Sequence, residues 1–380
     1  MTTVGIICEY DPMHLGHQKQ LNTIRSLVGA DCGIVCLMSG NFVQRGKPAI
    51  VHKSLRAEAA VRCGADLVLE LPVTASLSSA EGFAAKGVAI LGSFCDSLCF
   101  GAETADRNLL MSTAHNLLSD AFPSALRAGL DKGLSFPAAR AAALDAMGAD
   151  SRILSTPNNI LGIEYCKAII SQGCAMEPMP IKRGGSYHAQ TPDAQEPSAT
   201  AVRALMLGGQ NPSPYLPAPA WELFWDAQLH SLAAGERAIL TRLRTMTDAE
   251  FESLPYGSEG LWRKLMHAAR THTTLEEIAT AVKTKRYTRS RIDRMMMCAF
   301  LGLSAQNMAA PIPYARVLAF NDKGRLILKA ARETGIFPNI GEKLDHPYQQ
   351  IENRAAALYG LFALDRPEPP ADTSRVRYVK

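Results

Sequence analysis

The sequence predicts an α/β fold, in which a Rossmann-like parallel sheet is followed by a mostly helical C-terminal domain. Short apolar runs typical of buried strands recur in the first half of the chain, and segments with helical periodicity separate them. Beyond residue 220 the pattern is almost entirely helical. The expected strands are residues 4–7, 33–38, 66–71 and 97–100, with 176–182 as a candidate fifth strand and 316–320 as a short strand near the C-terminus.

A chain of 380 residues fits two or three domains. Residues 208–219 hold two glycines and four prolines, which cannot continue a helix or strand. We therefore expect a sheet domain at 1–207 with a helical insertion at 109–147, a linker at 208–219, and a mostly helical domain at 220–380. Individual helices are expected at 160–170, 221–232, 234–245, 260–271 and 275–282, the last behind a capping box of Thr274 and Glu277.

Composition excludes several classes of protein. No apolar run approaches the roughly 20 residues that span a bilayer, and the N-terminus lacks the pattern of a secretory signal, so we expect a cytoplasmic protein without a membrane partner. The nine cysteines are an odd number, several fall in expected strands, and neither disulfides nor structural zinc is expected. A net charge of +4 is mild, so nucleic-acid binding would need a local basic patch.

The first expected strand leads into a loop broken by Pro12 and then into a helix that opens with His14, Gly16 and His17. Two imidazoles three positions apart lie on one face of the first turn, where free backbone N–H groups and the helix dipole favour an anion. This arrangement predicts binding of ATP phosphates, with the imidazoles stabilising charge on the α-phosphate and the leaving pyrophosphate. A pair of surface histidines at a helix start is the alternative, and the position directly after a strand favours function.

Unusual residues also follow the other expected strands, at 39–41, 70–72 and 101–103. Because ligands of parallel α/β sheets bind at the carboxyl ends of the strands, these segments are predicted to converge on one crevice. Ser198, Thr200 and Arg203 open a further expected helix, where they can bind a phosphate or simply cap the helix. Further cations that can face a phosphate, or lie in an exposed turn or helix start, are Lys182, Arg183, Arg45, Lys47, Lys53 and Arg56.

The densest basic run spans residues 283–294, with six cations and one acid. Such a run attracts phosphates through counterion release, and Tyr287 within it can lie against a base. A solvated helix face is the alternative, although the cations do not alternate with acids. The candidate RNA-binding residues are Lys283, Lys285, Arg286, Tyr287, Arg289 and Arg291.

Taken together, these segments resemble the bacterial tRNA(Met) cytidine acetate ligases, members of a nucleotidyltransferase superfamily with an HxGH motif that is similar to class I aminoacyl-tRNA synthetases. The resemblance covers essentially the whole chain and its joint motifs are specific. It implies an enzyme that joins acetate to ATP as acetyl-adenylate, with Mg²⁺ accompanying ATP, and acetylates N4 of the wobble cytidine of elongator tRNA(Met). The motifs are residues 9–17, 38–46, 100–101, 157–162, 182–183, 198–200 and 285–291.

Carried over by position, the resemblance implies His14 and His17 as catalytic residues and residues 1–207 as the ATP-binding domain. Asp11 and Met13 depart from the Asn and Phe that the family commonly has. Two other functions stay open: an adenylyltransferase acting on a small phosphorylated metabolite, and a non-catalytic RNA-binding protein. The implied ATP contacts are Ile7, Cys8, Glu9, Tyr10, Asp11, Pro12, Gly16, Gln20, Gly101, Asn159, Lys182, Arg183, Ser198, Thr200 and Arg203.

Overall fold

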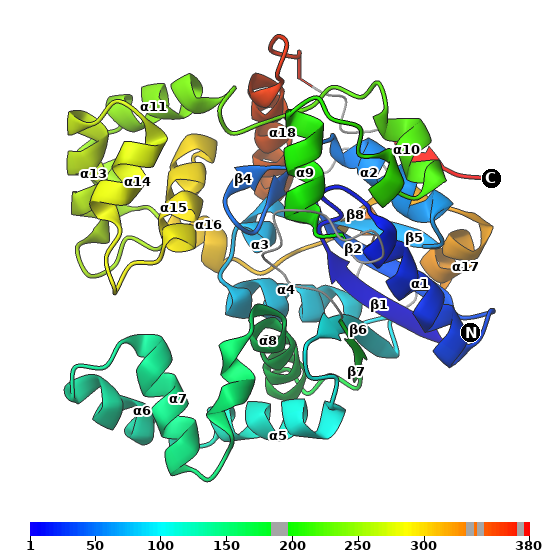
Figure 1. Cartoon of the computed structure of the whole chain (residues 1–380), viewed down its shortest axis with the longest axis horizontal. Coiled ribbons are helices and arrows are strands. Elements are labelled where there is room, and N and C mark those ends of the chain that lie inside the picture. Colours follow the sequence, from blue (N-terminus) through cyan, green and yellow to red (C-terminus); the bar gives the residue numbers. More distant parts are fainter. Residues whose placement is uncertain (184–196, 332–337, 340–345, 371–375) are drawn as a thin grey trace.

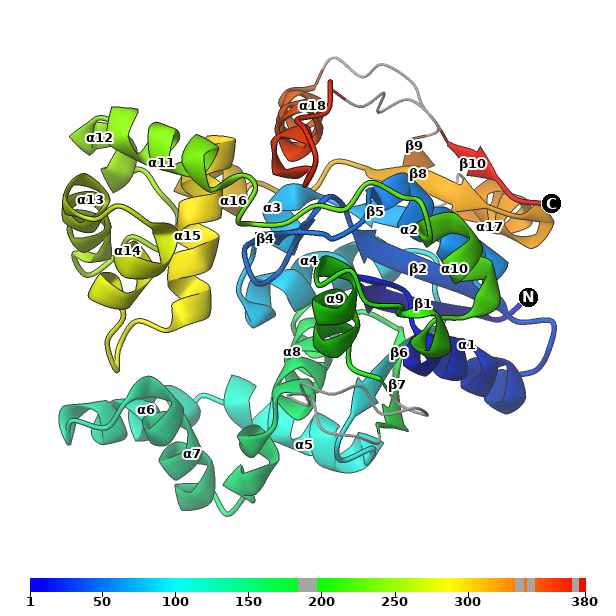
Figure 2. The same cartoon turned by 45° about the horizontal axis from the view of Figure 1, so that its top comes forward.

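A computed structural model describes residues 1–183, 197–331, 338–339, 346–370 and 376–380. A twisted sheet lies at the centre with helices against both of its faces, as Figures 1 and 2 show. Two groups of helices extend away from the sheet on the same side of the molecule. One contains α6 (Phe122–Asp131) and α7 (Phe136–Ala146), and the other runs from α11 (Glu236–Thr245) to α16 (Ala305–Ala309).

Within the described residues the main sheet has eight strands, in the order β10-β8-β5-β2-β1-β6-β7, with β9 beside β8. The five strands from β5 to β7 in this order are mutually parallel, which confirms the five strands and the parallel sheet predicted from sequence. The strands are β1 Thr3–Cys8, β2 Gly33–Ser39, β5 Leu67–Leu71, β6 Ser97–Ala102, β7 Glu177–Lys182, β8 Ala315–Phe320, β9 Pro338–Asn339 and β10 Arg377–Tyr378, and a separate hairpin pairs β3 Phe42–Val43 with β4 Lys47–Pro48.

Strand β1 is apolar from Val4 to Cys8 because both faces of the sheet are covered. Val4 and Ile6 belong to the core on one face, with α1 (Leu15–Val28), α2 (Lys53–Arg62), α9 (Ala199–Leu207) and α10 (Ala218–Phe224). Ile7 packs against the core on the other face. That second core is formed with α4 (Ala80–Leu91), α5 (Arg107–Leu118), α8 (Pro157–Ser171) and α17 (Asp322–Ala331).

A third apolar cluster lies among the C-terminal helices and also includes residues from the first half of the chain. It includes Phe42 of β3 and residues of α3 (Val73–Ser76), so the helical group packs directly against loops that follow β2 and β5. Its remaining elements are α11, α12 (Asp248–Glu252), α13 (Leu261–Thr271), α14 (Leu275–Val282), α15 (Arg289–Leu301), α18 (Pro347–Tyr359) and the short turn η4 (Gly360–Phe362).

The helix expected at 221–232 is shorter than predicted, since α10 ends at Phe224. The following segment makes tertiary hydrogen bonds instead of helical ones: His230 N–H donates to the Ile50 carbonyl at 2.9 Å and Ser231 N–H to the Phe362 carbonyl at 2.9 Å. In the expected linker, residues 213–215 form the single turn η2 (Ser213–Tyr215), and a comparable turn, η1 (Ser151–Ser155), precedes α8. The capping box of Thr274 and Glu277 on α14 is present as predicted.

The predicted short strand in the C-terminal half is present as β8, and it joins the main sheet antiparallel to β5. The sheet is therefore completed by residues from beyond the expected linker. All nine cysteines carry free thiols. None of the helices in the described parts of the chain combines the length and apolar character needed to cross a membrane.

Candidate functional site

A pocket of about 940 Å³ lies at the carboxyl edge of the parallel strands. The pairing register brings Cys8 opposite Met38, and Ala102 opposite Lys182, so these strand ends share one edge. The N-termini of α1 and α9, the β3–β4 hairpin and residues 230–233 complete the wall. Of the residues expected to contact ATP or act in catalysis, all line this pocket except Pro12 and Asn159.

His14 is the N-cap of α1 and is 3% exposed. Its Nδ1 accepts a hydrogen bond from Gly16 N–H at 3.1 Å, and Nδ1 of His17 accepts one from His14 N–H at 3.3 Å. The two rings stack with centroids 3.7 Å apart. A Cβ on Gly16 would lie 3.0 Å from Cε1 of His14. Glycine at this position therefore avoids a steric clash with the imidazole. The sequence thus opens α1 with a capping box made of two imidazoles.

These hydrogen bonds fix the state of both imidazoles. Because each Nδ1 accepts a hydrogen bond from a backbone N–H, each neutral ring carries its own hydrogen on Nε2. Burial, followed by the charges of Arg183 and Arg203, lowers the pKa of His14 to about 3. Burial, followed by His14 and Arg183, holds the pKa of His17 well below its usual value. Nε2 of His14 is buried without a hydrogen-bond partner. The site therefore presents an unused neutral N–H donor, which suits a phosphate oxygen.

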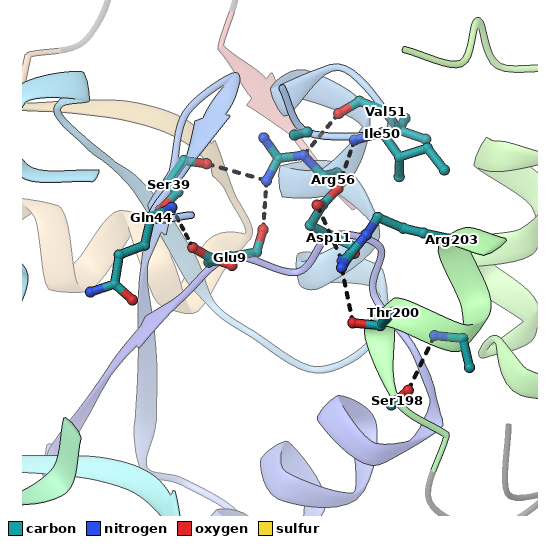
Figure 3. A network of polar contacts seen from close by, with 12 residues as sticks. Glu9, Asp11, Ser39, Gln44, Ile50, Val51, Arg56, Ser198, Thr200 and Arg203 are labelled. Atoms are coloured by element: carbon teal, nitrogen blue, oxygen red, sulfur yellow. Dashed lines mark hydrogen bonds and ion pairs between the residues drawn. The ribbon is translucent and has the colours of Figure 1, made fainter. Parts of the chain in front are cut away.

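The predicted phosphate-binding residues on α9 lie beside the loop that follows β1, as Figure 3 shows. Arg203 donates to the Asp11 carbonyl at 2.5 Å and to Thr200 Oγ1 at 3.2 Å, and its guanidinium lies 3.3 Å from Asp11 Oδ2. Ser198 caps α9 by accepting Ala201 N–H at 3.1 Å. Asp11 is 4% exposed, and its Oδ1 accepts Ile50 N–H at 2.7 Å. The carboxylate that departs from the family pattern thus pairs with Arg203.

Arg56 lies behind the pocket and is fully buried. It donates to the carbonyls of Glu9 at 2.5 Å, Ser39 at 3.2 Å and Val51 at 2.9 Å, and also to the carbonyl of Gly40 (Figure 3). The guanidinium therefore ties together the ends of β1 and β2. Sequence reasoning placed Arg56 among cations that can face a phosphate, but it does not line the pocket.

Lys53 is also buried rather than available to a phosphate. Its Nζ lies 2.5 Å from Glu70 Oε1, and Arg316 of β8 lies 3.7 Å from the other oxygen of the same carboxylate. Burial raises the pKa of nearby Glu352 to about 7, and the Glu70 carboxylate adds to this shift. These ion pairs join α2, β5 and β8 inside the protein, so their role is structural.

The two asparagines at the start of α8 have different surroundings. Asn159 is buried and holds the loop after β6, since its Oδ1 accepts Thr104 N–H at 2.9 Å and its backbone N–H donates to Glu103 at 2.9 Å. Asn158 lines the pocket, and its Oδ1 accepts from Arg183 Nη1 at 3.4 Å. The sequence resemblance selected Asn159, but the asparagine that lines the pocket is its neighbour Asn158.

The basic run lies outside this pocket, at the start of α15. Lys283, Lys285 and Arg286 are exposed, with Arg286 paired to Glu259 at 2.8 Å. The other two candidate cations interact with groups of the protein. Arg289 pairs with Glu276 and Asp293, each at 2.7 Å. Arg291 donates to the Tyr256 carbonyl at 2.8 Å.

Tyr287 belongs to the core of the helical group rather than to its surface. It is 4% exposed, and its hydroxyl donates to the Glu259 carbonyl at 2.8 Å. Lys264 and Arg291 lie over its ring at 5.5 and 5.4 Å from the centroid. This placement gives Tyr287 a packing role and leaves its ring little surface for a base.

The pocket contains residues that no sequence motif indicated. They come from the middle of helices or from irregular segments, where neither a motif nor the end of a strand marks them. The additional lining residues include Thr23, Phe83, Tyr165, His230 and Ser231. By contrast, Gln44 and Arg45 of the motif at 38–46, and Asn158 and Leu161 of the motif at 157–162, line the pocket and were marked in the sequence.

Comparisons with known proteins show the family to which the chain belongs. The family described as HIGH Nucleotidyl Transferase matches residues 1–369. The tRNA(Met) cytidine acetate ligase of Clostridium novyi (strain NT) is 37% identical over 357 residues, which make up 89% of this chain and 89% of that protein. Its counterpart in Clostridium acetobutylicum is 36% identical over 387 residues, or 95% of this chain and 96% of that protein.

Solved structures extend the similarity to three dimensions. The apo form I of Thermotoga maritima TmcAL superposes with a TM-score of 0.91 at 29% identity and covers 100% of both chains. Form II of that protein, bound with alpha-thio ATP, superposes with a TM-score of 0.88 at 29% identity and covers 100% of this chain and 99% of that one. Because the family and its named relatives match almost the whole length, the chain belongs to the HIGH nucleotidyl transferases and, within them, to the tRNA(Met) cytidine acetate ligase family.

Proposed function

We propose that this protein activates acetate with ATP as acetyl-adenylate and then acetylates N4 of the wobble cytidine of elongator tRNA(Met). The observation that carries this proposal is the pair of neutral imidazoles at the start of α1, with an unpartnered Nε2–H on His14, in a pocket that also contains Lys182, Arg183 and Arg203. The relatives named for this reaction, and the relative bound with alpha-thio ATP, support it.

The proposed first step needs positioning more than proton transfer. An acetate oxygen attacks the α-phosphorus, and pyrophosphate leaves while negative charge grows on the non-bridging and leaving oxygens. The Nε2–H groups of His14 and His17 are proposed to donate to these oxygens, and Arg183, Ser198, Thr200 and Arg203 to hold the β- and γ-phosphates. Preorganised donors of this kind stabilise the transition state by about 3–4 kcal/mol each.

Mg²⁺ is expected to accompany ATP. Among the residues that the structure describes, no group of three or more histidine, cysteine, aspartate or glutamate side chains is arranged to hold a metal ion. The ion would therefore be coordinated mainly by phosphate oxygens and water, as is usual for Mg²⁺ bound to nucleotides. The chemistry that it supplies there is neutralisation of phosphate charge.

The proposal also assigns different roles to the two parts of the chain. Residues 1–207 contribute most of the ATP pocket, and residues 220–380 contribute the RNA-binding surface. Lys283, Lys285 and Arg286, which are exposed, are the proposed contacts to the tRNA backbone, with Arg289 and Arg291 holding the start of α15 that presents them. ATP and tRNA as the proposed substrates support a cytoplasmic reaction.

Labelled acetate, ATP and a tRNA(Met) transcript test the proposal, with transfer of label to tRNA and acetate-dependent ATP–pyrophosphate exchange as readouts. His14→Ala is expected to lower the exchange rate about 100-fold or more, because it removes a preorganised donor. His115→Ala, an exposed histidine on α5, is the matched control and should change neither readout.

A transcript with uridine in place of the wobble cytidine should accept no label. Pyrophosphate release without acetate, and without any label on tRNA, would instead favour the adenylyltransferase of a small phosphorylated metabolite. Retention of full activity by His14→Ala would contradict both enzymatic proposals.

A further inference from the structure

Glu9 is a carboxylate at the exit of β1, and it lines the pocket. Its Oε1 accepts Gln44 N–H at 2.8 Å, and its backbone carbonyl accepts from Arg56 at 2.5 Å, so both the side chain and the chain around it are held in place (Figure 3). Among the described residues, no protein group donates to its second oxygen, Oε2. That oxygen is available to a ligand in the pocket.

The charges and hydrogen-bond donors of the three proposed substrates indicate which of them Oε2 of Glu9 can bind. The triphosphate of ATP and the acetate ion are anionic, and a carboxylate repels both of them. Acetate is also expected near the α-phosphate and not against a second carboxylate. The donors that remain are the adenine amine and ribose hydroxyls of ATP and the exocyclic amine of cytidine, and only the cytidine amine loses a proton during the proposed reaction.

Neighbouring groups favour the same assignment. The other carboxylate of this loop, Asp11, is already engaged by Arg203 and by Ile50 N–H, so it is not available to an amine. Burial raises the pKa of Glu9, and the nearby Asp11 carboxylate adds to this effect, while Gln44 N–H, Arg203 and Arg56 oppose it. A carboxylate with a raised pKa accepts a proton more readily than an ordinary one. The aromatic rings of Phe100 and Tyr165 line the same pocket.

We propose that Glu9 receives the N4 amine of the target cytidine through Oε2 and accepts its proton during acetyl transfer. This inference rests on the proposed function. The N4 lone pair forms the new C–N bond to the acetyl carbonyl carbon, and the bond from that carbon to the adenylate oxygen breaks. AMP leaves with the bonding electrons, and the amine proton goes to Oε2 of Glu9. The resemblance to the family implied an ATP contact for this residue, whereas this proposal assigns its Oε2 to the amine of the second substrate.

The experiment separates the two half-reactions. Acetate-dependent ATP–pyrophosphate exchange reports adenylate formation, and a single-turnover assay with labelled acetate reports transfer to tRNA(Met). Glu9→Gln keeps an oxygen that accepts Gln44 N–H but removes the base. The ratio of the transfer rate to the exchange rate should fall about 100-fold, as expected for loss of a general base. Glu9→Asp retains a carboxylate and should recover part of the loss.

Glu58→Gln is the matched control, because this α2 carboxylate lies outside the pocket and pairs with Arg62. It should leave the ratio unchanged. Thermal unfolding of Glu9→Gln should match the wild type, and acetate-dependent exchange should fall much less than transfer. Equal losses in both half-reactions, or a higher Mg²⁺ requirement for exchange, would assign Glu9 to the nucleotide and overturn the inference. A wild-type protein without acetate-dependent exchange would overturn the proposed function itself, which is a distinct result.

Discussion

The imidazoles of His14 and His17 enter the site as neutral donors, and the positive charge of the pocket comes from lysine and arginine. Their burial and hydrogen bonding at the start of α1 explain this division. A neutral donor stabilises a phosphate oxygen without the large desolvation cost of a buried cation. Protonation before ATP arrives would remove that advantage.

Replacing His14 by Asn should flatten the pH dependence of stability. The pKa of His14 falls from its ordinary value to about 3 on folding, so the unfolded chain binds more protons at intermediate pH. The stabilisation is complete above about pH 6.5 and is lost as the pH falls toward 3, at about 1.4 kcal/mol per pH unit. Between pH 7 and 5, His14→Asn should lose about 2 kcal/mol less than the wild type. Asparagine is a good N-cap, so α1 should persist.

Urea unfolding monitored by circular dichroism at both pH values measures this difference. An identical loss of unfolding free energy in both proteins would mean that His14 is protonated in the native state.

Asp11→Asn should strengthen ATP binding. The carboxylate now lies 3.3 Å from Arg203 and competes with phosphate for that cation. Asparagine retains an oxygen for Ile50 N–H and leaves the full charge of Arg203 to the nucleotide. We expect a dissociation constant lower by about 5-fold, which corresponds to about 1 kcal/mol, measured by isothermal titration calorimetry. Weaker binding by this variant would show that Asp11 positions Arg203 rather than restraining it.

At the scale of elements, the β3–β4 hairpin connects the pocket to the C-terminal helices. Gly46 has φ +71°, and a Cβ there would lie 2.6 Å from the backbone of Asp293 and Arg294 on α15. Gln44, Arg45 and Lys47 of the hairpin line the pocket. The hairpin therefore packs tightly against α15 on one side and lines the pocket on the other.

Gly46→Ala should be far more destabilising than Gly133→Ala. Gly133 has a similar φ of +80°, but a Cβ there meets nothing within 4 Å. Gly133→Ala should cost only the backbone strain, about 1 kcal/mol, whereas Gly46→Ala adds overpacking of about 1–3 kcal/mol. Midpoints of urea unfolding measure both. Equal midpoints would show that the hairpin separates from α15 without cost.

Sequence patterns predicted elements whose residues bury a whole face. The five parallel strands and the capped start of α14 follow from local composition and are confirmed. The helix through residue 232 was wrong beyond Phe224, because backbone hydrogen bonds to Ile50 and Phe362 replace helical ones there. Such partners are distant in sequence, and no local pattern encodes them.

The candidate site shows the same limit. The motif histidines and the residues of α9 line one pocket, as the convergence of strand ends predicts. Lys53 and Arg56 carry the positive charge expected of phosphate contacts. Inside the protein, however, Lys53 pairs with Glu70 and Arg56 donates to backbone carbonyls. Charge alone does not reveal whether a partner is buried beside it. The same holds for Tyr287, whose ring is covered by two cations of the helical group.

On the scale of the whole molecule, the two halves of the chain share one sheet. Strand β8 covers the edge of β5, and Glu352 of α18 accepts Val73 N–H at 2.7 Å. Phe42 and Leu77 lie in the apolar cluster of the C-terminal helices. The nucleotide pocket therefore depends on residues that follow the expected linker.

A fragment of residues 1–219 should not fold cooperatively. It would expose the edge of β5 and the apolar side chains that the C-terminal helices now cover, and an unpaired central strand favours aggregation. Thermal unfolding followed by circular dichroism and gel filtration should show no sharp transition and no monomeric species. A fragment that unfolds cooperatively and binds ATP would establish residues 1–207 as an independent folding unit.

The buried guanidinium of Arg56 has a consequence for the empty enzyme. This guanidinium donates to four carbonyl groups from three separate stretches of the chain, next to the pocket. Little conformational freedom is then left to lose when a nucleotide arrives, so association should be governed by how fast ATP diffuses in rather than by slow remodelling of the protein.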